Sequence, residues 1–229
     1  MTITIILIII LILLSTNNTE YFLEYDIDLY KSNKINVSNI NNITSFSVPL
    51  PLSELKTPSP NSSTETIKEL KDLVKFTAKR SKSQKLFFDN LNKIGIKQYW
   101  INYINQNGLK YSPEYLDKLY QDLDNYLNSL KFVYNRPRPK LLAYLLSPGY
   151  NLDIKSKLEN TPSYPSKSTC ISKVIAYVLI KSNPEKASEI SALAKKIELI
   201  NLYSGTHYKS DLDASNYISE IIQRNLKYS

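Results

Sequence analysis

The apolar residues that follow Ser63 recur at spacings of three and four, which is the period of an amphipathic α-helix. No stretch in this part of the sequence alternates apolar and polar residues as a half-buried strand would. The pattern therefore predicts an all-α fold, a compact bundle of helices. The helices it predicts cover residues 63–78, 83–94, 99–107, 112–130, 171–180, 183–204 and 217–226.

The sequence also carries signals for helix ends. Ser112 and Pro113 are typical of a helix start, because serine caps the first amides and proline fits the first helical position. Gly95 and Gly108 are typical of helix ends. The Pro-rich stretch after Leu130 is interpreted as a break between helices.

The composition excludes several kinds of site. A chain of 229 residues with one Cys and one His cannot build a Cys/His zinc site, a Cys–His protease pair or a haem attachment sequence. Its four Gly are too far apart for the phosphate loop of a nucleotide-binding fold. We expect no metal and no cofactor. The length suits one domain, and the net charge of +8 favours an anionic partner.

Residues 1–16 are predicted to be a signal peptide or a short membrane anchor. Every residue from Ile3 to Leu14 except Thr4 is a large aliphatic. At ~1.5 Å per residue a helix there spans roughly 20 Å, less than the ~30 Å of a bilayer core. A signal peptide fits this length better, although no Lys or Arg precedes the run, so both interpretations stay open. Either one predicts a secreted or luminal protein, which is membrane-anchored only if the segment stays uncleaved.

Residues 17–62 are predicted to form an irregular arm, rich in Asn, Ser and Pro, ahead of a helical domain of residues 63–229. Four N-x-[ST] sequences in the arm would be glycosylation acceptors in a secretory compartment. They begin at Asn17, Asn36, Asn42 and Asn61. Whether they are used, and the oligomeric state, stay open.

Three junctions between loops and helices carry side chains suited to catalysis. The first, residues 131–139, contains two Arg that alternate with Pro, and taken alone it is typical of charges at a helix C-terminus. The second, residues 163–169, opens an apolar helix whose first backbone amides could hold a phosphate. The third contains His207, with Asp211 four residues later, a spacing that lets a carboxylate orient an imidazole.

In this order the three segments resemble the motifs K-x6-RP, PSGH and R-x5-H-x3-D of the type 2 phosphatidic acid phosphatase and vanadium haloperoxidase superfamily, and above all its bacterial class A nonspecific acid phosphatases. The residues that fit are Lys131, Arg138, Pro139, Pro165, Ser166, His207 and Asp211. At three positions the chain departs from the motifs: Lys167 replaces Gly, Ser168 replaces His and Asn201 replaces Arg. The resemblance covers about Ser63 to the C-terminus and implies an acid phosphatase-type bundle with a degenerate active site.

The resemblance also implies a mechanism, in which a histidine attacks phosphorus and forms a phosphohistidine. His207 would be this nucleophile, and Asp211 would orient it. Lys131, Arg138 and Ser166 would bind the phosphate oxygens. The second histidine of the family, which protonates the leaving group, has no counterpart, because the chain contains no other His.

This loss leaves two functions open. The first is an acid phosphatase, a hydrolase of phosphorylated small molecules, whose turnover is impaired by the residues at Ser168 and Asn201. Lys167 would return a cation to the phosphate site, or else it would point to solvent. The alternative is an inactive pseudophosphatase that binds inorganic phosphate or acts as an interaction module. Vanadium peroxidase chemistry is disfavoured, since it also uses the missing second His.

Two other patterns are set aside. Asp122 and Asp124 spell the D-x-D of metal-dependent sugar transferases, but we expect both of them on the polar side of a helix. The basic cluster of residues 79–85 is expected to be a solvated helix junction. Nucleic acid is therefore not an expected partner.

Overall fold

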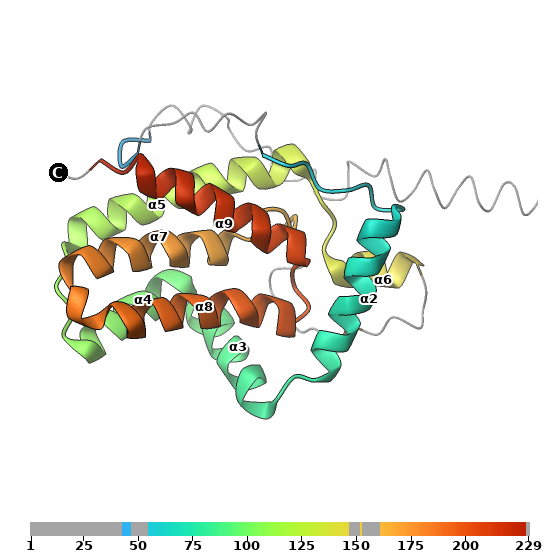
Figure 1. The fold of residues 1–229 in the computed structure, drawn as a ribbon, viewed down its shortest axis with the longest axis horizontal. Helices are drawn as coiled ribbons and strands as arrows, with labels where there is room; N and C mark the ends of the chain where they lie inside the picture. The colour runs from blue at the N-terminus through green and yellow to red at the C-terminus, as the bar shows by residue number, and fades with distance from the viewer. Residues whose placement is uncertain (1–42, 47–54, 147–151, 153–160, 228–229) are drawn as a thin grey trace, which may run out of the picture.

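The computed structural model describes residues 43–46, 55–146, 152 and 161–227 (Figure 1). These residues form helices and no β-strand, apart from one isolated bridge between Phe46 and Leu226. The all-α bundle expected from the sequence is confirmed. In chain order the elements are α2 (Thr64–Ala78), α3 (Lys82–Ile94), α4 (Ile96–Asn107), α5 (Pro113–Tyr134), α6 (Pro139–Leu146), α7 (Lys167–Ser182), the 3-10 turn η5 (Pro184–Lys186), α8 (Ala187–Tyr203) and α9 (Lys209–Arg224).

Each helix expected from the periodicity is present, and α6 is a further one. The expected break is present at residues 135–138, between α5 and α6, but it is short, because α6 already begins at Pro139. Proline at the first helical position costs no hydrogen bond, because the N–H at that position has no partner within a helix. Helix α9 begins at Lys209, well before the expected start at residue 217. The periodicity did not indicate this start, because Leu212 and Ala214 are the only apolar residues between 209 and 216.

A serine cap and a left-handed glycine lie at helix ends that the sequence indicated. Ser112 Oγ accepts a hydrogen bond from Tyr115 N at 3.2 Å, and Pro113 is the first residue of α5. Gly108 ends α4 with a φ of 59°, a left-handed conformation that glycine adopts without a steric penalty.

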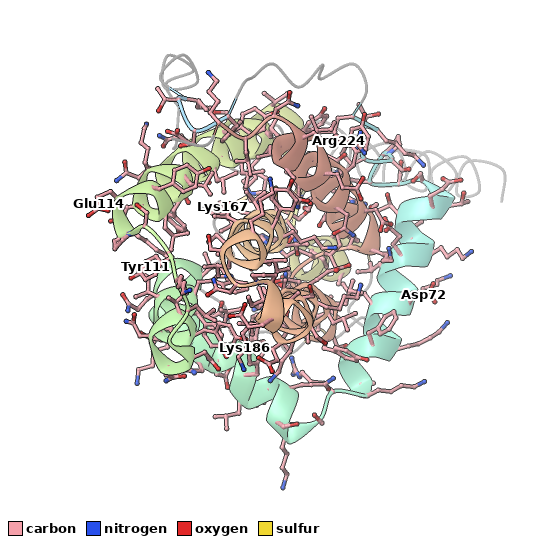
Figure 2. All side chains as sticks on the ribbon, turned by 60° about the vertical axis from the view of Figure 1, so that its left-hand side comes forward. Asp72, Tyr111, Glu114, Lys167, Lys186 and Arg224 are labelled. Carbon is pink, nitrogen blue, oxygen red and sulfur yellow. The ribbon has the colours of Figure 1, made fainter. Side chains whose placement is uncertain are left out.

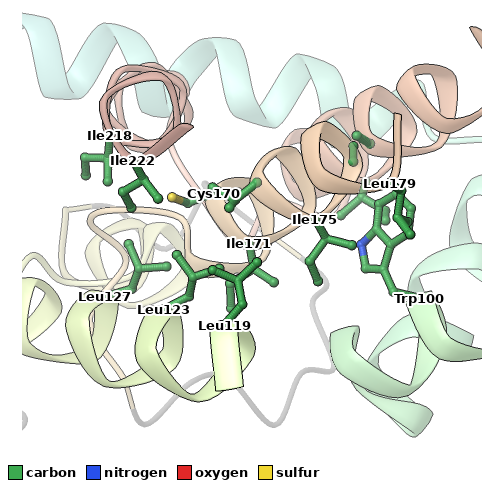
Figure 3. Close-up of a cluster of buried hydrophobic side chains, with 14 of the residues drawn as sticks. Trp100, Leu119, Leu123, Leu127, Cys170, Ile171, Ile175, Leu179, Ile218 and Ile222 are labelled. Carbon is green, nitrogen blue, oxygen red and sulfur yellow. The ribbon is translucent and has the colours of Figure 1, made fainter. Parts of the chain in front are cut away.

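Helix α7 lies at the centre of the bundle, between α5, α8 and α9 (Figure 1). Figure 3 shows the apolar side chains of α5, Leu119, Leu123 and Leu127, facing Ile171 and Ile175 of α7. All five are buried. Burial of one such aliphatic side chain contributes about 1.5–3 kcal/mol. The surrounding helices therefore fix α7, and with it the loop that enters its N-terminus.

Helix α2 forms a second layer at the edge of the molecule, where it packs against α8 (Figure 2). Its buried Leu70 and Leu73 belong to a smaller apolar cluster with Leu142 of α6 and with Tyr208 and Leu212. Tyr208 directly precedes α9. The cluster therefore brings the middle of α2 next to the N-terminus of α9.

The described part of the arm is attached to α5 through a buried carboxylate. Asp122 Oδ2 accepts hydrogen bonds from Thr44 N and Ser45 N at 3.0 and 2.9 Å, and its Oδ1 accepts one from Lys118 Nζ at 2.7 Å. Asp122 is only 2% exposed. The expectation that it lies on the polar side of its helix is wrong, because the arm covers this face of α5.

The predicted signal peptide or anchor, residues 1–16, and most of the predicted arm lie outside the described residues. The same holds for three of the four N-x-[ST] sequences, those that begin at Asn17, Asn36 and Asn42. Among the helices of the described ranges, none is long and apolar enough to cross a membrane.

Candidate active site

The site residues predicted from the three motifs converge at one end of the bundle, where α5 ends, α6 and α7 begin, and α8 turns into α9. Lys131 lies in the last turn of α5, Ser166 immediately precedes α7, and His207 lies in the α8–α9 turn. All three are buried. A hydrogen bond of 3.2 Å from Ser166 N to Asp211 O joins the start of α7 to the start of α9. Segments that are far apart in the sequence thus form one cluster.

The imidazole of His207 is held between a carboxylate and a guanidinium. Its Nδ1 lies 3.3 Å from Asp211 Oδ2, and its Nε2 lies 2.9 Å from Arg138 Nη1. A guanidinium can only donate, so Nε2 accepts this hydrogen bond and the ring proton is on Nδ1, facing Asp211. Burial, together with the charge of Arg138, lowers the pKa of His207 to about 3. Near neutral pH the ring is uncharged and Nε2 carries a lone pair, as a nucleophile requires.

Asp211 is fully buried, yet it stays ionised. Burial alone would raise its pKa, but the Arg136 guanidinium, the imidazole and a backbone amide outweigh this effect and hold the pKa well below its usual range. Arg136 Nη1 donates to Oδ1 at 2.8 Å, and Tyr208 N donates to Oδ2 at 2.9 Å. Both oxygens are thus engaged, which fixes the direction in which the carboxylate faces Nδ1.

Two charged residues of this network were missed by the sequence analysis. Arg136 pairs with Glu69 of α2, with 3.0 Å between Nη2 and Oε2, and its guanidinium lies 3.9 Å from the centre of the Tyr208 ring. Glu69 also accepts a hydrogen bond from Ser210 N at 2.7 Å. The alternation of Arg and Pro in residues 136–139 was a usable signal for Arg136. The carboxylate of α2 left no signal, because it meets α9 only in the folded chain.

Two cations hold the segment that leads into α7. Lys131 Nζ donates to Pro162 O at 2.6 Å and to Ser163 O at 3.1 Å, and Arg138 Nε donates to Thr161 O at 2.7 Å. Burial, helped by the nearby Arg138 charge, lowers the pKa of the Lys131 ammonium. Both cations lie near the imidazole. Lys131 Nζ and Arg138 Nε point at backbone carbonyl oxygens. Their assignment as phosphate ligands stays a prediction.

The three positions that depart from the family motifs fall into two groups. Asn201 Nδ2 donates to Ser168 Oγ at 3.1 Å and to Thr169 Oγ1 at 3.0 Å, so two of the replaced positions contact each other. Lys167 instead lies between α7 and α5, where its Nζ is 2.7 Å from Asp124 Oδ1 (Figure 2). An ion pair therefore takes up its charge. Its assignment as a phosphate ligand also stays a prediction.

The hydroxyl of Ser166 completes the cluster. It is fully buried, 2.8 Å from Thr169 Oγ1 and 3.4 Å from Asn201 Nδ2. The site thus combines an uncharged imidazole, three buried cations, a buried carboxylate and a group of hydroxyls. Within the residues that the structure describes, no group of three His, Cys, Asp or Glu side chains is suited to hold a metal ion.

A cavity of about 440 Å³ lies beside α2 and α9. Its walls include Tyr164, Ser210 and the carboxylates of Glu65, Glu69 and Asp213. Lys56 also lines the cavity, so three carboxylates stand against one cation, and this net negative lining disfavours an anionic ester. We therefore do not assign this cavity to a phosphorylated substrate.

Comparison with known proteins finds two curated relatives. The chain is 28% identical to a non-specific acid phosphatase of Salmonella typhi over 122 residues, which are 50% of this chain and 48% of the relative. It is 27% identical, with the same coverage, to a non-specific acid phosphatase of Salmonella typhimurium strain LT2. The chain thus spans about half the length of the curated relatives it matches. No family model matches the chain. What the comparisons establish is a distant similarity to non-specific acid phosphatases over half of this sequence.

Proposed function

We propose that the protein hydrolyses phosphomonoesters through a phosphohistidine at His207, as an acid phosphatase whose leaving group receives no proton from a histidine. The orientation of the imidazole carries this proposal. The ring proton is on Nδ1, which faces Asp211, so the lone pair of Nε2 is available for attack on phosphorus. The distant similarity to non-specific acid phosphatases supports the same chemistry.

In the proposed reaction Nε2 forms a bond to phosphorus while the bond from phosphorus to the ester oxygen breaks. The developing imidazolium is stabilised by Asp211 through Nδ1–H. Water then attacks the phosphohistidine, which releases phosphate and restores the uncharged ring. Lys131, Arg138 and Ser166 would bind the phosphate oxygens, and for this their donors have to turn from the protein acceptors that they now contact.

The ester oxygen leaves without help from a strong acid. The resemblance places the general acid at Ser168, but a serine hydroxyl is a poor acid near neutral pH, and this one contacts Asn201. General acid catalysis contributes typically ~10²–10⁴-fold to a rate. Turnover should therefore depend on the leaving group, and aryl phosphates, whose phenolate needs little protonation, should react far faster than alkyl phosphates.

The test compares kcat/KM for an aryl phosphate and an alkyl phosphate in the full chain, from acidic to neutral pH. We expect a large preference for the aryl ester and loss of both activities in His207→Ala. Glu198→Gln is the matched control, because Glu198 is a buried carboxylate, 4% exposed in its side chain, that pairs with Lys195. Equal rates on the two esters, or full activity in His207→Ala, would contradict the proposal.

A second candidate is a pseudophosphatase that binds phosphate without turnover. The contact between Arg138 and His207 favours it, since the guanidinium now occupies the lone pair of the nucleophile. This candidate predicts that phosphate or vanadate binds to the full chain while no ester is cleaved. A phosphoryl group trapped on His207 during incubation with an aryl phosphate would exclude it.

We also propose that the protein acts outside the cytoplasm. The aliphatic run from Ile3 to Leu14 supports export, and its length supports cleavage after export more than anchoring. N-terminal sequencing of the exported protein tests this directly. A first residue beyond position 16 is expected, and an intact Met1 on a membrane-bound protein would indicate the anchor.

A further inference from the structure

A chain of three buried or half-buried charges runs from α2 to the imidazole. Glu69 Oε2 lies 3.0 Å from Arg136 Nη2, and Arg136 Nη1 lies 2.8 Å from Asp211 Oδ1. The side chains of Arg136 and Asp211 are 1% and 0% exposed, and that of Glu69 is 21% exposed. Arg136 is therefore the direct counterion of a carboxylate that water does not reach.

Arg136 is itself held in one orientation. Its Nη1 donates to Ser210 Oγ at 2.7 Å, and its guanidinium plane lies against the Tyr208 ring. Glu69 accepts hydrogen bonds from Ser210 N and Ser210 Oγ, both at 2.7 Å, so it also caps the first turn of α9. Arg136 and Asp211, the carboxylate whose charge it balances, are thus both held at the N-terminus of α9.

Several titratable groups face Asp211, and only some of them favour its charge. They are Arg136 ahead of α6, His207 and Tyr208 in the α8–α9 turn, Lys131 of α5, Tyr164 ahead of α7 and, behind the guanidinium, Glu69 of α2. Of the two cations in this set, Lys131 donates to carbonyl oxygens of residues 162 and 163, whereas Arg136 donates to the carboxylate itself.

The proton on the pair formed by His207 and Asp211 depends on this cation. With Arg136 beside Asp211, and with Arg138 Nη1 2.9 Å from Nε2, the pair carries a single proton, on Nδ1, and Nε2 is free of hydrogen. Without Arg136, a second proton binds more readily. It goes to the imidazole, whose ordinary pKa of 6.5 lies above the 3.8 of the carboxyl group. The proton then occupies Nε2, which loses its lone pair.

We propose that Arg136, fixed by Glu69 and Ser210, is a positioning residue that acts through Asp211, beside the direct contact of Arg138, to keep the lone pair on Nε2 of His207. The position of the ring proton of His207 follows from the hydrogen-bond geometry, whereas its consequence for catalysis rests on the proposed phosphatase function. Arg136 does not have to touch the substrate for this role, because it acts through Asp211.

The chain offers a direct measurement, since His207 is its only histidine. Incorporation of ¹⁵N-labelled histidine gives NMR signals from one imidazole, and these signals distinguish a ring nitrogen with hydrogen from one without. In the wild-type chain we expect Nε2 to become protonated only at strongly acidic pH, with a midpoint near the lowered pKa of His207 of about 3. In Arg136→Gln we expect the midpoint for protonation of Nε2 to rise by about 1–3 pH units.

Two further variants make the result specific. Arg136→Lys keeps the charge but not the planar fork, so its midpoint should lie between those of the wild type and Arg136→Gln. Glu198→Gln neutralises a buried carboxylate away from the site and should leave the midpoint unchanged. If Arg136→Gln does not fold, Arg136→Lys carries the test. A wild-type midpoint in either Arg136 variant, or an equal shift in Glu198→Gln, overturns the proposal.

The activity profile separates this proposal from the proposed function. If the chain cleaves an aryl phosphate, the acidic limb of kcat/KM should move to higher pH in Arg136→Gln by the same amount as the NMR midpoint. If His207→Ala keeps full activity, the phosphatase mechanism fails while the NMR result stands. If His207→Ala is inactive but neither readout moves in Arg136→Gln, the role of Arg136 fails while the mechanism stands.

Discussion

Arg138 Nη1 lies 2.9 Å from Nε2 of His207, the atom that has to reach phosphorus in a phosphohistidine mechanism. Arg138 Nη1 also donates to Thr206 O at 3.0 Å. The guanidinium therefore covers the reactive side of the ring. A phosphate group that enters the site has to draw the guanidinium away from the lone pair, and phosphate oxygens are strong acceptors for this purpose.

Inorganic phosphate is therefore expected to change the surroundings of Nε2 directly. Titration of the full chain with phosphate should shift the ¹⁵N signal of Nε2 in a saturable manner. In Arg138→Gln phosphate binding should weaken, and the pKa of His207 should rise because a nearby cation is removed. A saturable shift of equal affinity in the variant would show that Arg138 does not bind the anion.

Acid should destabilise the fold through His207. The group is uncharged in the native state, with a pKa of about 3, whereas its ordinary value is 6.5. Its contribution to the free energy of unfolding is thus fully present above pH 6.5 and is lost as the pH falls from 6.5 toward about 3. The loss amounts to at most ~1.4 kcal/mol per pH unit. Urea unfolding measures it, and His207→Gln should show a flatter dependence over this window. Equal slopes in the two proteins would contradict the buried, uncharged state.

The arm should depend on Asp122 for its attachment. Asp122→Ala removes the acceptor of two backbone amides and of a lysine, and unpaired buried donors cost about 1–3 kcal/mol. We expect a loss of unfolding free energy of this size, together with faster proteolysis between residues 43 and 62. Asp124→Ala, two residues along the same helix, is the control. Its half-buried ion pair with Lys167 should contribute only about 0–1 kcal/mol. Similar losses in the two variants would argue against the attachment.

Restoring the family residues should restore acid catalysis. The triple variant Lys167→Gly, Ser168→His, Asn201→Arg is expected to raise kcat/KM for an alkyl phosphate by ~10²–10⁴-fold. The gain on an aryl phosphate should be smaller, because its leaving group needs less help. Lys167→Gly alone is the control and should give no such gain, since this lysine pairs with Asp124. An unchanged alkyl rate in the triple variant would mean that the replaced positions do not limit the reaction.

Local sequence patterns were sufficient for most of the fold. The three- and four-residue spacing located the helices of the bundle, because one face of each helix has to be apolar to pack. Ser112 and Gly108 marked ends, because capping depends on neighbouring residues alone. Helix α6 escaped this reasoning, since Pro139 opens a helix and was taken to interrupt one.

Motif spacing likewise identified the residues that surround the imidazole. His207 and Asp211 are four residues apart, so the contact between them follows from local geometry. The motifs also named Lys131, Arg138 and Ser166, which the fold brings to the same end of the bundle.

What only the tertiary structure decided is the set of partners that these side chains have. Glu69 reaches the network from α2, the Asp122 carboxylate binds the arm, and Lys167 pairs across to α5. Such contacts join residues far apart in the chain and leave no period or fixed spacing in the sequence. By itself the sequence located the helices and identified His207 and its carboxylate partner, Asp211. The packing of α2 against the start of α9 brings Glu69 to Arg136 and Asp211, and the fold places Arg138 beside Nε2, which determines which nitrogen of His207 carries the proton.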